Sequence, residues 1–126
     1  IVDIYQTKYV YKQSKKLNIP NLDWIKAIEN LNNTSTTAYL GSHVYKLRLA
    51  ANNKGKSGGY RGILIYKKDN LILIISVFSK ANQENLKREE LDLLKKLGQS
   101  YLNLTQTDIN ILINRKALIN IGEINE

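Results

Sequence analysis

Three segments decide the fold predicted for this chain, namely HVYKLRLA (43–50), YRGILIYK (60–67) and LILIISVF (71–78). The first alternates in the manner of a β-strand, with Lys46 and Arg48 on one face and apolar side chains on the other. Residues 52–59 are Gly-rich and predict a turn, and residues 68–70 predict a short hairpin. The third segment is apolar throughout, which indicates a central strand buried on both sides.

Helical patterns flank these strands along the sequence. Residues 1–5 predict a first strand, and residues 7–17 and 21–31 predict two amphipathic helices. A further helix is expected from about residue 86, and a capping box of Thr105 and Asp108 begins a last short one. The order β-α-α-β-β-β-α-α predicts an α+β fold, with helices packed on one face of a small, mainly antiparallel sheet. We expect residues 1–126 to form one domain.

The charge of the chain is strongly positive and unevenly distributed. Its formal net charge is +8, and residues 1–80 hold 13 of the 19 basic residues but only 4 of the 11 acidic ones. Such a field favours nucleic acid, an anionic membrane surface or an acidic protein as partner. No apolar run approaches the roughly 20 residues of a membrane span, no signal peptide is evident, and cysteine is absent. We therefore expect a cytoplasmic protein that does not bind membranes.

The residue types present narrow the chemistry. Gly55-Lys56-Ser57 resembles the end of a nucleotide-binding P-loop, but Ala50 stands where that motif needs glycine and a strand follows instead of a helix. Because the chain has one histidine and no cysteine, we expect no metal site and no other cofactor. His43, at the edge of a strand, is more often structural than catalytic in such a position. Its place near the basic face keeps it as a candidate contact for RNA.

The basic residues between 46 and 61 therefore carry the functional signal. Lys46, Arg48, Lys54, Lys56 and Arg61 occur there without a single carboxylate. Cations that converge in this way bind phosphodiesters, and they can cleave RNA because its 2′-hydroxyl is a built-in nucleophile. Such a site needs to align that hydroxyl, remove its proton and stabilise the charge on phosphorus. A solvated hairpin loop is the simpler explanation for Lys54 and Lys56.

The order of these motifs resembles the RelE superfamily of bacterial toxin-antitoxin systems. The resemblance rests on YKLRL (45–49), GYR (59–61) and SVFSK (76–80) and extends over essentially the whole chain. The segments GKSGGYR (55–61), SKANQENL (79–86) and KALINIGE (116–123) are more particularly similar to the HigB-type branch. The resemblance implies an endoribonuclease toxin that cleaves messenger RNA, usually on the ribosome, and that a cognate antitoxin silences.

The resemblance also implies roles for individual residues. Lys46 and Arg48 match a basic pair on the second strand of the family pattern, Arg61 matches an arginine that stabilises the transition state, and Lys80 matches a proton donor. Two positions depart from that pattern. A lysine that could serve as general base is Arg48 here, and Arg stays protonated, while a catalytic tyrosine position falls near Leu86. Lys46 or Lys56 is left as the candidate base. Lys54, Tyr60, Tyr66 and His43 are candidate RNA contacts.

Two other functions remain open on the same fold. ParE-type relatives inhibit DNA gyrase without cleaving RNA, and a basic surface could block translation by binding ribosomal RNA. The full basic set at positions 46, 48, 61 and 80 favours the ribonuclease. The implied partners are a HigA-like, helix-turn-helix antitoxin, mRNA and the ribosome, with operator DNA contacted only through the antitoxin.

Overall fold

The computed structural model describes residues 1–50, 59–67, 71–81 and 86–125. The turn expected over 52–58, including Lys54 and Lys56, and the hairpin expected at 68–70 lie outside the described residues. The described elements are, in chain order, β1 (Val2–Thr7), α1 (Lys8–Lys16), α2 (Asn21–Glu29), β2 (Thr37–Gly41), β3 (Val44–Leu49), β4 (Tyr60–Lys67), β5 (Leu71–Ser79), α3 (Arg88–Leu102), α4 (Gln106–Asn114) and β6 (Leu118–Ile124).

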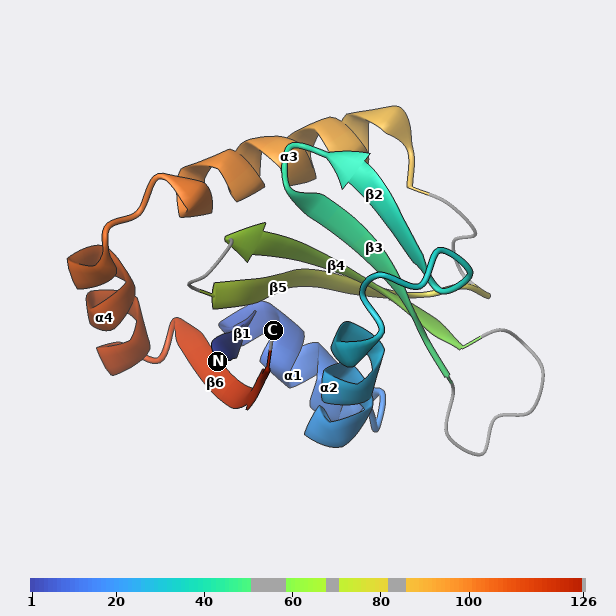
Figure 1. Cartoon of the computed structure of the whole chain (residues 1–126), viewed down its shortest axis with the longest axis horizontal. Coiled ribbons are helices and arrows are strands. Elements are labelled where there is room, and N and C mark those ends of the chain that lie inside the picture. Colours follow the sequence, from blue (N-terminus) through green and yellow to red (C-terminus); the bar gives the residue numbers. More distant parts are fainter. Residues whose placement is uncertain (51–58, 68–70, 82–85, 126) are drawn as a thin grey trace.

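The strands form one six-stranded sheet in the order β2-β3-β4-β5-β1-β6 (Figure 1). All neighbours are antiparallel except β1 and β5, which are parallel. This confirms the predicted α+β class, the mainly antiparallel sheet and the three consecutive strands β3, β4 and β5. The apolar strand β5 lies between β4 and β1 and is buried over most of its length, as its composition predicts.

The two outermost strands were not predicted. β2 occupies residues at the end of the polar loop, and β6 occupies residues where no element was expected. Both are edge strands, so only part of each is buried and neither shows a regular alternation of apolar residues. β6 also contains Gly122 and pairs with β1 across a shift in register, and pairing over that sequence distance leaves no local pattern.

The expectation that the helices pack on one face of the sheet is wrong. Val10 of α1 and Trp24 and Ile28 of α2 belong to one apolar cluster. A second cluster, on the opposite face, contains Ile109 of α4 and packs against side chains of α3. Figure 1 shows α3 along one side of the sheet and α1 and α2 along the other. The physical reason is that β4 and β5 are apolar on both faces, so each face must be covered.

Side chains on neighbouring strand positions divide between these two clusters. Leu47 and Leu49 of β3 contribute to the cluster of α1 and α2, while Val44 contributes to the cluster of α3 and α4. This confirms the alternation predicted for residues 43–50. Lys46 and Arg48 lie two and four residues after Val44 on the same strand, so they face the α3 side of the sheet as Val44 does.

Candidate functional site

A hollow of about 250 Å³ lies at the ends of β3, β4 and β5, on the α3 side of the sheet. We call it the basic pocket. It contains four of the five residues predicted to be catalytic, and the fifth, Lys56, is outside the described residues. Its lining residues are Thr34, Ser35, Thr36, Thr37, Ala38, Lys46, Leu47, Arg48, Arg61 and Lys80.

Strand register brings three of the cations together. In the antiparallel pairing of β3 and β4, Arg48 is directly opposite Arg61, and Lys46 is opposite Ile63. Ile63 and Ile65 lie in the cluster beneath α3, so Arg61, which shares their parity, projects from the same face. The pairing of β3 with β4 thus places Lys46, Arg48 and Arg61 around one pocket.

Lys80 reaches the same face because of a β-bulge. Leu71, Leu73 and Ile75 of β5 face α3, and strict alternation would direct Lys80 to the opposite side. The pairing of β4 with β5 shifts register between Ile63 and Leu64. Beyond that shift Val77 packs with the α1 and α2 cluster while Phe78 packs with the α3 cluster, so the alternation is reversed.

Because of this reversal, the Lys80 side chain lies on the same face of the sheet as that of Arg61. The Lys80 amide continues the ladder by donating a hydrogen bond of 3.1 Å to the Gly59 carbonyl, which holds the residue beside the start of β4. Lys80 is one of the residues that line the basic pocket. The cation set is therefore assembled from three adjacent strands by one register and one bulge.

Arg61 is the most constrained cation of the set. Only 7% of its surface is exposed, and its Nη1 donates a hydrogen bond of 3.2 Å to the carbonyl of Tyr60. Burial lowers the pKa of Arg61, and the nearby positive charge of Arg48 lowers it further. Both effects oppose a positive charge at this place. An anion that enters it relieves the repulsion between the two guanidinium groups.

The exposed Arg48 offers a way to test this repulsion. We expect Arg48→Gln to raise the free energy of unfolding by roughly 0.2–1 kcal/mol, because like charges directly opposite in a sheet are destabilising. Added inorganic phosphate should raise the melting temperature of the wild-type protein more than that of the variant. Arg88→Gln, which removes a charge from the exposed start of α3, is the matched control. Equal stability and equal phosphate shifts in all three proteins would contradict the repulsion.

The wall of the pocket formed by Thr34–Ala38 was not predicted as part of the site. The Asn33 side chain shapes this wall, since its Oδ1 accepts hydrogen bonds from the backbone N–H and the hydroxyl of Ser35, at 3.0 and 2.7 Å. The Thr36 carbonyl accepts a hydrogen bond of 2.9 Å from the Arg48 amide, which fixes the loop against β3. The Ser/Thr run after α2 was the available signal, but its position beside β3 depends on the unpredicted strand β2.

Arg48 also borders a second hollow, of about 240 Å³, between the end of β3 and α2. Asp23, Lys26 and Asn30 contribute to its walls, and Thr36 and Arg48 are common to both hollows. The two hollows therefore meet at Thr36 and Arg48.

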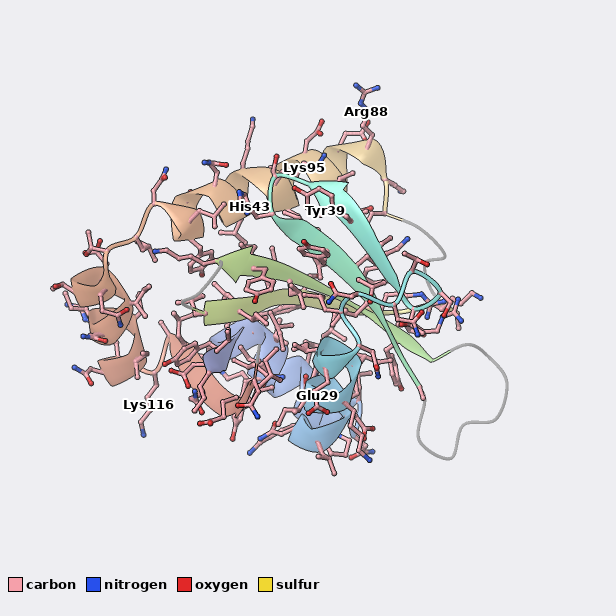
Figure 2. All side chains as sticks on the ribbon, in the orientation of Figure 1. Glu29, Tyr39, His43, Arg88, Lys95 and Lys116 are labelled. Carbon is pink, nitrogen blue, oxygen red and sulfur yellow. The ribbon has the colours of Figure 1, made fainter. Side chains whose placement is uncertain are left out.

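The structure places the other predicted RNA contacts away from the basic pocket. Tyr60 and Tyr66 pack against the cluster of α1 and α2, on the opposite face of the sheet. His43 is exposed in the β2–β3 turn, at the other end of β3 from Arg48, with a positive φ of 66°. Figure 2 shows it beside Tyr39 and Lys95, and its amide donates a hydrogen bond of 3.3 Å to the Tyr39 hydroxyl. Leu86 packs against the α3 cluster.

Among residues 1–50, 59–67, 71–81 and 86–125, no group of three or more His, Cys, Asp or Glu side chains gathers as metal ligands would. None of the helices in those ranges has the length and apolar character needed to span a bilayer.

Comparison with known protein families identifies one match. A family model described as the RelE toxin of the RelE / RelB toxin-antitoxin system matches residues 2–121. That range contains all four helices of the described chain and every residue that lines the basic pocket. No curated protein matches the sequence.

Proposed function

The chain belongs to the RelE toxin family of toxin-antitoxin systems, and from this we propose that it is an endoribonuclease that cleaves mRNA and thereby inhibits translation. The observation that supports this most strongly is the convergence of Lys46, Arg48, Arg61 and Lys80 on one pocket. An inhibitor that acts only by binding has no need for several cations around one pocket, whereas phosphoryl chemistry requires them. We further propose a cytoplasmic, HigB-type toxin whose RNA substrate is bound on the ribosome.

The reaction we propose uses the RNA itself as nucleophile. Lys46 takes the 2′-hydroxyl proton, and the 2′-oxygen forms a bond to the adjacent phosphorus. Arg61 and Arg48 stabilise the added negative charge on the phosphorane through paired N–H donors. The bond from phosphorus to the 5′-oxygen breaks, and Lys80 donates a proton to that oxygen. The products are a 2′,3′-cyclic phosphate and a 5′-hydroxyl, and the mechanism requires no metal.

The walls of the pocket support this assignment of roles. Arg61 is held in place by burial and by its bond to the Tyr60 carbonyl, as a group that stabilises a transition state should be. Lys46 and Lys80 approach from different strands, which suits a base and an acid that serve opposite sides of phosphorus. Lys56, the alternative base, lies outside the described residues.

The partner we propose is a HigA-like antitoxin with a helix-turn-helix domain. Membership of the family implies an antitoxin of some kind. The positive surface favours an acidic segment as the inhibitory element, and contact with operator DNA is then made through the antitoxin.

Mapping of transcript 5′ ends in a bacterial translation extract tests the function directly. With the purified toxin we expect new 5′-hydroxyl ends inside coding regions and cyclic phosphate on the upstream fragments. Naked transcripts treated in parallel should remain intact if the ribosome is required. Intact messages together with inhibited gyrase supercoiling would establish the ParE-type function instead. Intact messages on stalled ribosomes would indicate a translation blocker that only binds RNA.

A further inference from the structure

A second concentration of positive charge lies on α1, on the opposite face of the sheet from the basic pocket. This helix contains four exposed lysines, Lys8, Lys12, Lys15 and Lys16, and no acidic residue. At 3.6 residues per turn, the four fall within an arc of about 100° on the helix surface. Its buried residues, Val10 and Ser14, are on the other side, so all four ammonium groups project from one stripe.

A turn far away in sequence adds to this stripe. The amide of Lys8 donates a hydrogen bond of 3.1 Å to the carbonyl of Ala117, so the residues between α4 and β6 lie against the start of α1. Lys116, the residue before Ala117, is exposed, and Figure 2 shows its side chain projecting away from the body of the protein. We call these residues the α1 basic band, which consists of Lys8, Lys12, Lys15, Lys16 and Lys116.

Helix stability favours Lys15 and Lys16, which are in the last turn of α1, but it does not explain Lys8 and Lys12. Lys8 is in the first turn of α1, where the helix dipole disfavours a positive charge, and no acidic side chain offsets it. Lys8, Lys12 and Lys16 follow one another at intervals of four residues, a spacing at which like charges repel. No carboxylate in the described ranges forms an ion pair with these three lysines. Lys15 alone has a local contact, 4.6 Å from the ring centre of Tyr11.

We propose that the α1 basic band binds the phosphate backbone of folded RNA, separately from the RNA strand in the basic pocket. Lysines spaced regularly along one side of a helix suit the regular line of phosphates along a duplex, without reading sequence. The apolar side of α1 is buried in the protein, and Tyr9 is the one large hydrophobic side chain that this helix exposes, which is too little surface to anchor the helix in a bilayer. Cations on both sides of one sheet fit a protein held between two RNA surfaces.

Binding measurements with two separate RNA probes test the proposal without relying on cleavage. One probe is a blunt 16-base-pair RNA duplex, and the other is a single-stranded RNA octamer with 2′-O-methyl groups, which cannot react. We expect Lys12→Glu/Lys16→Glu to bind the duplex at least about tenfold more weakly and to lower the salt slope of binding by about two. Its affinity for the octamer should stay close to that of the wild type.

Arg88→Glu/Lys96→Glu is the matched control, because it makes the same change in net charge on exposed positions of α3. It should bind the duplex nearly as well as the wild type. The Lys12→Glu/Lys16→Glu protein should melt close to the wild-type temperature, since the attraction that Lys12→Glu creates with Lys8 is offset by the repulsion between the two introduced carboxylates. Equal losses of duplex binding in both double variants would show that only net charge matters and would overturn the proposal.

Two further outcomes would also overturn the proposal. In the first, polyglutamate competes for the α1 basic band as effectively as an RNA duplex of the same total charge. In the second, the α1 basic band binds phosphatidylserine vesicles in place of RNA. Failure of the proposed ribonuclease function is recognised separately. In that case Arg61→Ala would leave octamer binding unchanged and the wild-type protein would leave transcripts intact, while the duplex measurements would keep their outcome.

Discussion

Arg61→Ala is expected to reduce the rate of mRNA cleavage by about a hundredfold or more, because Arg61 is the buried donor that we propose stabilises the developing charge on phosphorus. The fold should remain intact. The substitution removes a buried charge and its repulsion with Arg48, which offsets the loss of the hydrogen bond to the Tyr60 carbonyl, so the melting temperature should change little. Single-turnover cleavage in a translation extract, with thermal melting of each protein, measures both effects.

Arg61→Lys and Arg88→Ala make the result interpretable. Lysine keeps the charge but lacks the planar pair of donors, so its activity should fall between that of the wild type and that of Arg61→Ala. Arg88 projects from the start of α3, away from the body of the protein in Figure 2, and its loss should leave cleavage unchanged. A folded, fully active Arg61→Ala protein would reject the role assigned to Arg61.

Gly62→Ala is expected to destabilise the protein by about 1–3 kcal/mol through overpacking, although it adds a single methyl group. A Cβ at this position would lie 2.3 Å from Cζ3 and 2.6 Å from Cη2 of Trp24. The indole is fully buried and its Nε1 donates a hydrogen bond of 3.0 Å to Ser14 Oγ, so the ring cannot move aside freely. Chemical denaturation of the two proteins gives the difference.

The same substitution should also lower activity, since Gly62 directly follows Arg61 on β4 and a displaced strand moves the guanidinium. A double-mutant cycle with Trp24→Phe identifies the cause, because phenylalanine lacks the outer ring of the indole. The double variant should be less destabilised than the sum of the two single variants. Additive losses would mean that the contact between Gly62 and Trp24 is not the source.

Much of the fold could be predicted because it depends on local pattern. The alternation in β3, the apolar run of β5 and the capping box of Thr105 with Asp108 are all properties of adjacent residues, and each is present in the structure. The one-sided arrangement of helices failed because the sequence pattern does not report which face each helix covers. β2 and β6 were missed because edge strands bury too little to impose a regular pattern.

The same distinction between local sequence pattern and strand pairing applies to the candidate site. Lys46 and Arg48 could be placed on one face by the period of two alone. Their alignment with Arg61 required the register of β3 with β4, in which Arg48 is opposite Arg61. The Thr34–Ala38 wall, in turn, depends on β2 pairing with β3.

The sequence by itself determined that residues 43–50 form a strand with basic side chains on one face and apolar side chains on the other, and that residues 71–78 form a buried strand. It also determined that arginine and lysine are the available functional groups. The family resemblance implied Lys80 as a further member of the set, but only the tertiary structure decided that it lies on the same face as the others. Regular alternation along β5 places Lys80 on the opposite face, and the bulge in its pairing with β4 reverses that parity beyond Ile75. A bulge is a property of two paired strands, so neither strand's sequence reveals it separately.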